Sequence, residues 1–400
     1  MVATEYPWPE NSGSRMRLAA TLEALGHCGE VELFCAVSQT RRDFEPPPPT
    51  PALARHLRLA IDDRPPGPAD LARCLVHPDA PFEMPLRAQG PVGRALGRFV
   101  HGAYDLVWFF QVRAWVLAHA ALDASAPVVV DIDDLEDQKI LARAALPPRP
   151  PQARGWLRHG AGSLWTVEDV RRWRRLHRTV AQRAAATVVC SELDARRAAL
   201  PGVRVVRNGY RPPAHPVGRA KVGDPPVVVF QGTLRYAPNA DAARFLVEDV
   251  GPRLRRLVPH VQVRLVGLPS PALAALDDPP AVVLTGQVPD ITDELSRADL
   301  VVIPLRYASG TRVKILEAFA HRIPVVSTTM GAEGLEVTAG THLLVADNPD
   351  AVAQACARLL EDDRLRQAVV DQAHALFVDR YRSAVVQREV VALAHEVAAR

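Results

Sequence analysis

The sequence lacks the features that indicate a disulfide scaffold, a membrane span or a general nucleic-acid binder. Its 400 residues include only five cysteines, at positions 28, 35, 74, 190 and 356, and none forms a CxxC pair. We therefore expect reduced core thiols. No apolar stretch approaches the roughly 18 residues that a transmembrane helix needs. The formal net charge of +3 is close to neutral, which argues against nucleic acid as a partner.

The start of the chain also lacks a targeting signal. Its first residues, MVATEYPWP, contain no signal-peptide pattern, which predicts a cytoplasmic protein. The chain opens almost inside a strand, as expected if a few upstream residues are missing. With 48% hydrophobic residues, a chain of this length can form two domains, each with a full core.

One segment divides the chain. Residues 211–226, RPPAHPVGRAKVGDPP, are polar and aperiodic, as expected of an interdomain linker between domains at 1–210 and 227–380. After it, short apolar runs alternate regularly with helical patterns, which predicts an α/β fold with a doubly wound parallel sheet. The predicted strands of this half are Val227–Gln231, Val261–Val266, Val282–Leu284, Leu300–Ile303 and Val325–Ser327.

The strongest candidate site lies in SGTRVKILEAFAHRIPVVSTTMGAEGL, residues 309–335. Arg312 and Lys314 fall in the first turn of a predicted helix, where the positive end of the helix dipole repels cations. A bound anion would remove this conflict, and exposed helix-start amides favour phosphate. Glu317, one turn later, can accept hydrogen bonds from hydroxyl groups. The two cations and this carboxylate together suggest a nucleotide-sugar site. The alternative is an ordinary surface helix with a Lys314–Glu317 ion pair.

Two strand-to-helix loops carry weaker candidates. Gly13 precedes a helix predicted at Ser14–Leu25, and Arg15 and Arg17 in its first turn would make an anion cradle. In the second half, Gly232 allows close backbone approach to a ligand, and Arg235 could meet a phosphate.

A carboxylate cluster, DIDDLED, follows the strand predicted at Pro127–Ile132. Open α/β sheets bind ligands at this carboxyl edge, which draws attention to Asp131 and Asp133. They could orient substrate hydroxyls, act as a base, or cap the next helix. No metal site is predicted, because no matching set of histidines or carboxylates is evident.

A basic segment at 154–183 contains eight arginines and three tryptophans. An arginine-rich amphipathic helix can lie on an anionic membrane, so peripheral contact with the inner face of a membrane stays open. The alternative is a core-facing helix with a solvated polar face. On the helix predicted from about Val167, one apolar stripe comprises Val170, Trp173, Leu176 and Val180.

Together these segments resemble the GT-B fold retaining glycosyltransferases, specifically glycosyltransferase family 4. The resemblance covers nearly all of the second half and patches of the first. Besides the 309–335 segment, the motifs that match in order are PWPENSGSRMR, VVCSELD at 188–194, VRVVRNGY at 203–210, FQGTLRYAPN at 230–239, VPDITDELSRADLVVIPLR at 288–306 and HLLVADNPDAV at 342–352.

The resemblance implies two Rossmann-like domains that face a central cleft. The C-terminal domain would hold the nucleotide sugar, the N-terminal domain the acceptor, and a final helix at 381–400 would cross back onto the first domain. The donor-binding residues that it implies are Gly13 in the N-terminal glycine loop, Arg235 and Lys314 near the diphosphate, Gly310 and Thr311 in the turn at the phosphates and donor sugar, and Glu317 at the ribose. To these the residues themselves add Gly232 and Arg312 as candidate donor contacts, together with Ser309 at the start of the same turn.

Three positions depart from the family pattern. Ser309 stands where the first Glu of an E-x7-E pattern is expected, so the donor-sugar contact there must differ. Gln111 replaces a frequent histidine, and Arg322 stands where a helix-ending glycine is usual.

The activity implied is that of a retaining, metal-independent hexosyltransferase. It would use a nucleotide-diphosphate sugar as co-substrate, with no cofactor, and a glycan, lipid-linked or natural-product acceptor. Arg312 and Lys314 would stabilise the leaving diphosphate. Two alternatives stay open: a nucleotide-sugar 2-epimerase of the same fold, and a sugar-nucleotide-binding partner protein.

Overall fold

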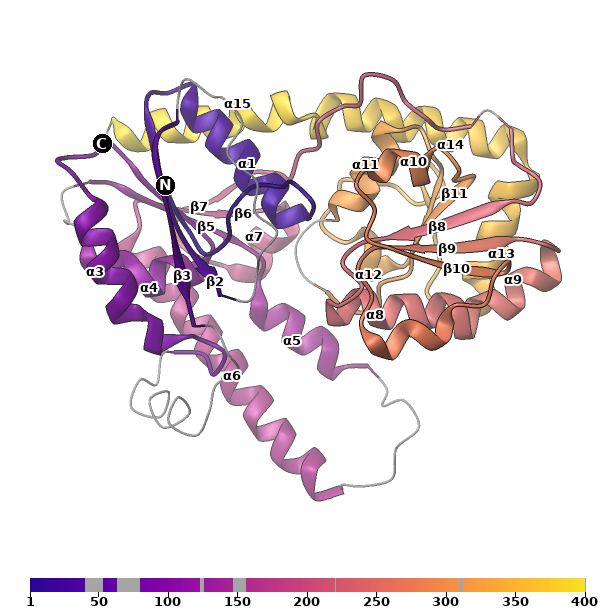
Figure 1. Ribbon diagram of the computed structural model, residues 1–400, viewed down its shortest axis with the longest axis horizontal. Helices are drawn as coiled ribbons and strands as arrows, with labels where there is room; N and C mark the ends of the chain where they lie inside the picture. The colour runs from indigo at the N-terminus through magenta and orange to yellow at the C-terminus, as the bar shows by residue number, and fades with distance from the viewer. Residues whose placement is uncertain are drawn as a thin grey trace. The chain divides into compact units, whose positions relative to one another are not determined.

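The computed structural model describes residues 1–39, 53–62, 80–122, 126–146, 156–219, 221–308 and 312–399, and of 156–163 only the backbone. The chain forms two compact units (Figure 1). The first comprises Met1–Arg207 and Val386–Arg400, and the second comprises Asn208–Val385. Residues 211–226, predicted as a linker, belong to the second unit, where the Gly218 amide donates to the His321 carbonyl at 2.8 Å.

The first unit contains a parallel sheet in the order β3-β2-β1-β4-β5-β6-β7. The chain order reverses between β1 and β4, so the sheet has a topological switch point there. The strands are β1 Val2–Ala3, β2 Val31–Ser38, β3 Leu53–Ile61, β4 Val107–Phe110, β5 Val128–Asp133, β6 Ala186–Val189 and β7 Val203–Val205.

Helices cover both faces of this sheet. Successive strand residues point to opposite faces, so Phe34 of β2 joins one core and Cys35 the other. The first core is completed by α3, α4 and α6, and the second by α1 and residues 386–397 of α15. The helices are α1 Gly13–Gly26, α3 Gln89–Phe99, α4 Val112–Ala118, α5 Glu136–Ala144, α6 Trp156–Arg183, α7 Glu192–Ala198 and α15 Ser383–Ala398, with 3-10 turns at Leu86–Ala88 and His119–Ala121.

The second unit contains a parallel sheet in the order β10-β9-β8-β11-β12-β13, with its switch point between β8 and β11. The prediction of a doubly wound parallel sheet is confirmed. The strands are β8 Val227–Gln231, β9 Gln262–Val266, β10 Val282–Gly286, β11 Leu300–Ile303, β12 Val325–Ser327 and β13 Leu344–Val345.

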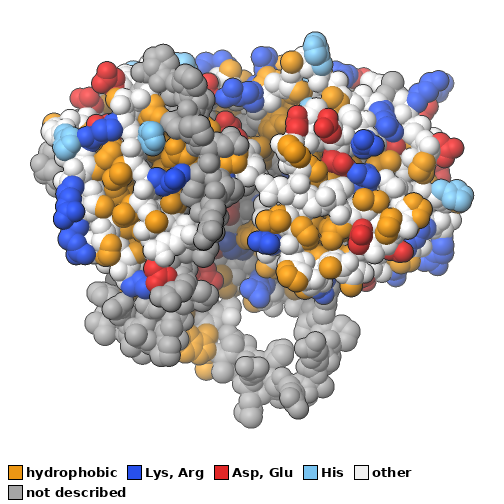
Figure 2. Space-filling model, viewed as in Figure 1, with side chains coloured by type: hydrophobic (Ala, Val, Ile, Leu, Met, Phe, Trp, Pro, Cys, Tyr) orange, Lys and Arg blue, Asp and Glu red, His pale blue; other side chains and the backbone are white. Residues whose placement is uncertain are grey.

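Helices of the second unit follow the predicted alternation, and α11 begins at Val313. On the face drawn in Figure 2, basic and acidic side chains of the described residues are interspersed. The helices are α8 Ala237–Arg244, α9 Gly251–Leu257, α10 Ile291–Leu295, α11 Val313–Ala320, α12 Thr329–Ala332, α13 Pro349–Glu361 and α14 Asp363–Leu376, with π turns at Phe245–Val250 and Phe377–Tyr381 and a 3-10 segment at Pro271–Leu276.

Candidate functional site

Two glycines lie close together at the carboxyl edge of the second sheet. Gly232 follows β8 and Gly267 follows β9, with φ angles of 144° and 132° that favour glycine. A Cβ atom on Gly267 would lie 1.9 Å from the Gly232 carbonyl oxygen, and one on Gly232 would lie 2.9 Å from Lys314 Nζ. The bare backbone therefore gives the Lys314 ammonium room at the switch point.

Lys314 is a half-buried cation in the first turn of α11. Its Nζ donates to Asn239 Oδ1 at 2.8 Å and lies 4.9 Å from the centroid of the Phe230 ring. Burial, aided by the nearby Arg312 charge, lowers the pKa of Lys314 to about 7. A bound anion would favour the charged form, so this position suits a phosphate group.

Arg312 is the N-cap residue of α11 and its side chain is buried. The sequence placed it inside the first turn, whereas it directly precedes the first helical residue, because apolar periodicity does not locate a helix start to within a residue. Its position beside Lys314 is consistent with a diphosphate site. Ser309, Gly310 and Thr311 lie outside the described residues, so their donor contacts stay predictions.

Glu317 lies on α11, one turn after Lys314, and its side chain is 6% exposed. It accepts hydrogen bonds from Gln231 Nε2, at 3.2 Å from Oε2, and from the Tyr210 hydroxyl. Burial raises the pKa of Glu317, although these two donors and Lys314 oppose the shift. Sequence reasoning missed Gln231, Asn239 and Tyr210 as members of this cluster, although all three lie in motifs that carried the family resemblance.

Arg235, the other candidate phosphate ligand of the second unit, is exposed on the loop between β8 and α8. Its Nε donates to the Pro269 carbonyl at 3.3 Å. Its contact with a diphosphate stays a prediction.

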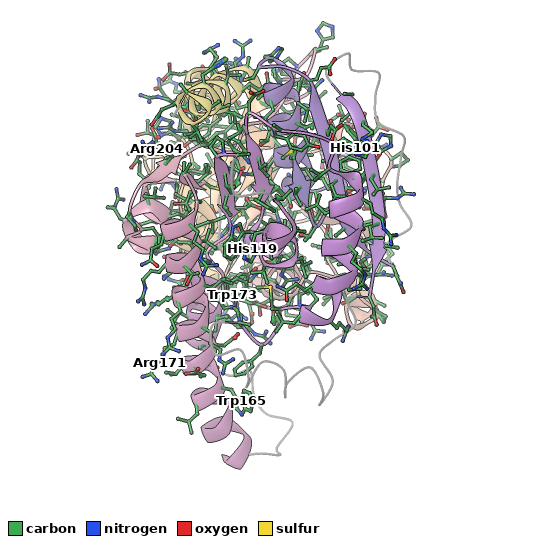
Figure 3. All side chains as sticks on the ribbon, turned by 90° about the vertical axis from the view of Figure 1, so that its left-hand side faces the viewer. His101, His119, Trp165, Arg171, Trp173 and Arg204 are labelled. Carbon is green, nitrogen blue, oxygen red and sulfur yellow. The ribbon has the colours of Figure 1, made fainter. Side chains whose placement is uncertain are left out.

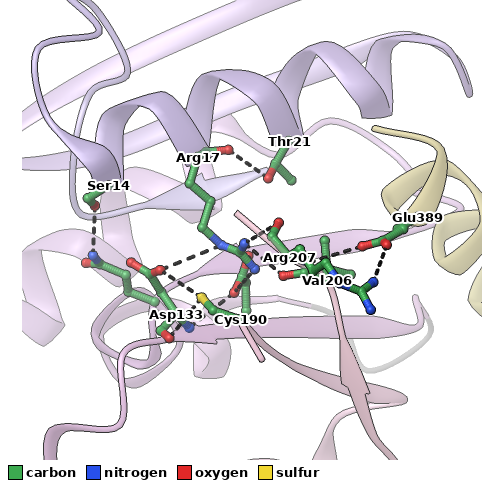
Figure 4. A network of polar contacts seen from close by, with 10 residues as sticks. Ser14, Arg17, Thr21, Asp133, Cys190, Val206, Arg207 and Glu389 are labelled. Carbon is green, nitrogen blue, oxygen red and sulfur yellow. Dashed lines mark hydrogen bonds and ion pairs between the residues drawn. The ribbon is translucent and has the colours of Figure 1, made fainter. Parts of the chain in front are cut away.

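In the first unit, Arg17 and Asp131 form a buried bidentate ion pair (Figure 4). Arg17 Nε and Nη2 lie 3.0 Å from the two Asp131 oxygens, and Arg17 Nη1 donates to the carbonyls of Val206 and Arg207. Arg15 donates to the Pro9 carbonyl and to Asn11. The Arg17 guanidinium group is thus paired with a carboxylate of its own chain, which contradicts its part in the predicted anion cradle, whereas the part of Arg15 stays a prediction. A basic residue near a helix start has the same sequence pattern whether it binds a ligand anion or an acceptor of its own chain.

Asp133 lies next to this pair, with a φ of 60° that is strained for a residue with a side chain. Its amide donates to Asp131 Oδ1 at 3.1 Å, and Cys190 Sγ lies 3.4 Å from Asp133 Oδ1. Burial, aided by the Asp134 and Asp131 charges, raises the pKa of Asp133 to about 7. Asp131 thus orients its neighbours, whereas Asp133 can hold or release a proton near neutral pH. Catalytic roles for both stay predictions.

Gln111 occupies the switch point of the first sheet, directly after β4. Its φ is 69°, its Oε1 accepts from Thr4 Oγ1 at 3.1 Å, and its Nε2 donates to Ser14 Oγ at 3.1 Å. These bonds tie β4 to the start of α1, where Gly13 is the first helical residue. The role of Gly13 toward a diphosphate stays a prediction.

The basic helix α6 begins at Trp156, well before the predicted start, because its amino-terminal part lacks the apolar stripe that guided the prediction. The stripe itself is confirmed as buried: Val170, Trp173, Leu176 and Val180 are at most 5% exposed. Figure 3 shows Trp173 on the side of α6 that faces the rest of the first unit, and Arg171 pointing away from the rest of that unit.

Within the described ranges, no three histidine, cysteine or acidic side chains cluster as metal ligands would. None of the helices in those ranges combines the length and apolar character that crossing a bilayer requires.

Comparison with known proteins gives a family match within the second unit. The family model described as glycosyl transferases group 1 matches residues 225–362. The match covers 138 of the 400 residues of the chain. The Bacillus subtilis strain 168 protein TuaC, named for teichuronic acid biosynthesis, is 33% identical over 95 residues, which are 23% of this chain and 24% of TuaC. The match thus spans about a quarter of the length of that curated relative.

Solved structures show that the whole chain has the GT-B fold. Sucrose-phosphate synthase from Thermosynechococcus elongatus superposes with a TM-score of 0.69 at 16% identity, over 97% of this chain and 94% of that one. Anabaena HepE in complex with UDP-glucose gives a TM-score of 0.64 at 14% identity, over 98% of both chains. The predicted fold, two Rossmann-like domains with parallel sheets, is confirmed.

Proposed function

We propose that the protein transfers a sugar from a nucleotide-diphosphate donor to an acceptor hydroxyl, with retention of anomeric configuration and without a metal ion. One observation carries the proposal: α11 brings Lys314 and Glu317 to the switch point of the second sheet, beside Gly232. The cation suits a diphosphate and the carboxylate suits ribose hydroxyls. The UDP-glucose complex of HepE, a protein of the same fold, supports this donor class.

The chemistry follows from where charge develops. As the glycosidic bond to the diphosphate breaks, the sugar gains oxocarbenium character and negative charge builds on the leaving group. The Lys314 ammonium and the Arg312 guanidinium would stabilise that charge electrostatically. The departing phosphate takes the proton of the acceptor hydroxyl as the new carbon–oxygen bond forms on the same face. No protein nucleophile takes part.

The first unit is the proposed acceptor side. Asp133, with a pKa of about 7, is the carboxyl that we expect to contact an acceptor hydroxyl. Asp131 acts through it as a positioning residue, since its carboxylate holds the Asp133 amide and Arg17. A glycan is the favoured acceptor class, in line with the name of TuaC, and lipid-linked sugars and small natural products are the alternatives.

A membrane surface is the proposed peripheral partner of α6. Leu164, Val167, Arg171, Arg175 and Arg178 recur every three or four residues, so they share one helix face, and all five are exposed. Leu164 and Val167 are 75% and 48% exposed. Apolar side chains followed by three arginines suit an anionic bilayer.

Vesicle binding tests this partner. Changing Arg171, Arg175 and Arg178 to Gln should weaken binding to phosphatidylglycerol vesicles about 100-fold, since each arginine contributes about 1 kcal/mol near an anionic surface. The control changes three scattered exposed arginines, Arg196, Arg256 and Arg358, to Gln. Equal losses in both triple variants would contradict a specific α6 contact.

The function itself is tested with a thermal-shift panel of nucleotide sugars, because a ligand of the folded state raises the melting temperature by mass action. The stabilising donor is then incubated with and without acceptors, with and without EDTA. Transfer that needs an acceptor, retains configuration and tolerates EDTA is the expected result. Formation of an epimer from the donor alone would favour the 2-epimerase. Tight donor binding without turnover would favour the non-enzymatic binding partner.

A further inference from the structure

Gln231, the last residue of β8, has a buried side chain whose amide orientation is fixed by its neighbours. The side chain is 4% exposed. Its Nε2 faces two acceptors, Glu317 Oε2 at 3.2 Å and the Lys314 carbonyl at 3.4 Å. Because only the NH2 group can donate to both, the carbonyl oxygen Oε1 must point to the other side.

Gln231 Oε1 has no hydrogen-bond partner in the part of the chain that the structure describes, although the atom is buried. Most buried polar atoms in native proteins are satisfied, because an orphaned acceptor loses its hydration without compensation. The oxygen lies at the carboxyl edge of β8, beside the switch point where open α/β sheets bind their ligands. A ligand that satisfies it must bring a donor, either a hydroxyl or an N–H group.

We propose that Gln231 is a specificity-determining residue that accepts a hydrogen bond from a ribose hydroxyl of the donor nucleotide. This inference rests on the proposed function, because it concerns the same donor site. Gln231 is hydrogen-bonded to Glu317 through Nε2, so each of the two side chains has an acceptor oxygen near the end of β8. Vicinal ribose hydroxyls supply two donors, one for each of these acceptors, whichever base the nucleotide carries. Gln231 thereby selects ribonucleotides over deoxyribonucleotides.

The test compares ribonucleotide and deoxyribonucleotide binding in the full-length protein. UDP, 2′-deoxy-UDP and 3′-deoxy-UDP are titrated calorimetrically, or the corresponding set for whichever base the thermal-shift panel selects. In the unaltered protein, loss of the contacted hydroxyl should weaken binding about tenfold, since a buried acceptor is left unpaired. Gln231→Met keeps the side-chain length, removes the acceptor and should abolish most of this preference.

The matched control is Gln262→Met, the same change at the amino end of neighbouring β9, where Nε2 donates to the Pro280 carbonyl. It should keep the full ribose preference. Equal binding of ribo- and deoxynucleotides by the unaltered protein overturns the proposal, and that measurement does not depend on any variant folding. A full ribose preference in Gln231→Met also overturns it. Absence of nucleotide binding altogether would contradict the proposed function instead.

Discussion

Replacing Asp131 by asparagine should strongly destabilise the first unit. The change keeps the shape of the side chain but removes the charge of the bidentate partner, and it leaves Arg17 with the more distant Asp133 carboxylate, whose Oδ1 lies 3.7 Å from Arg17 Nε. The two side chains are only 3% and 1% exposed and share hydrogen bonds of 3.0 Å, so water cannot replace the lost partner. Breaking one side of a buried ion pair costs about 3–5 kcal/mol. Against a usual domain stability of about 5–15 kcal/mol, that is a large loss.

Tryptophan fluorescence can follow the first unit alone, because all six tryptophans of the chain lie between Trp8 and Trp173. Urea unfolding followed at tryptophan emission therefore measures the unit that contains the ion pair. With a slope of about 2–3 kcal/mol per molar urea, the midpoint should fall by about 1–2 M in Asp131→Asn.

An exposed ion pair in the same unit is the matched control. Arg113 and Glu83 lie 3.4 Å apart with side chains 39% and 65% exposed, so Glu83→Gln should cost less than about 1 kcal/mol. A combined Arg17→Met and Asp131→Leu variant should be less damaged than Asp131→Asn, because it leaves no guanidinium group in the core without its bidentate partner. Equal midpoints for Asp131→Asn and Glu83→Gln would refute the structural role assigned to the buried pair.

Two further predictions concern the second unit. Nucleotide-sugar affinity should fall by up to about tenfold per pH unit above pH 7, because the free Lys314 deprotonates there and binding must restore its proton. Lys314→Arg should flatten the pH dependence of the affinity. The same pH dependence in Lys314→Arg and in the unaltered protein would contradict the assignment to Lys314. Calorimetric unfolding should show a loss of about 3 kcal/mol for Gly267→Ala, whose Cβ would collide with the Gly232 carbonyl. Gly286→Ala, at a strained but uncrowded position, should lower the free energy of unfolding by only about 1–2 kcal/mol. Equal losses in the two variants would argue against the close approach of Gly267 to the Gly232 carbonyl.

Local sequence patterns predicted the strands of the second sheet well. Val227–Gln231, Leu300–Ile303 and Val325–Ser327 have the predicted bounds, because strands buried on both faces are uninterrupted apolar runs. β13, with two residues, is too short to leave such a signal. Arg322, noted in the sequence as replacing a usual glycine, does adopt a glycine-like φ of 60°.

Contacts between distant residues could not be predicted in the same way. Arg17 and Asp131 are 114 positions apart, and Gln231 and Glu317 are 86 apart. A lone arginine at a helix start has the same sequence signature whether it meets a phosphate or a carboxylate of its own chain. Only the fold distinguishes the two cases, and it gives Arg17 a carboxylate.

The most direct test of the donor site separates its two halves by calorimetry. Lys314→Ala and Glu317→Ala are each titrated with the nucleotide sugar and with the free nucleoside, which lacks the diphosphate. Lys314→Ala should weaken binding of the nucleotide sugar far more than binding of the nucleoside. Glu317→Ala should weaken the binding of both ligands to the same extent. Equal losses for both ligands in Lys314→Ala would contradict the assignment of α11 to a nucleotide-diphosphate sugar.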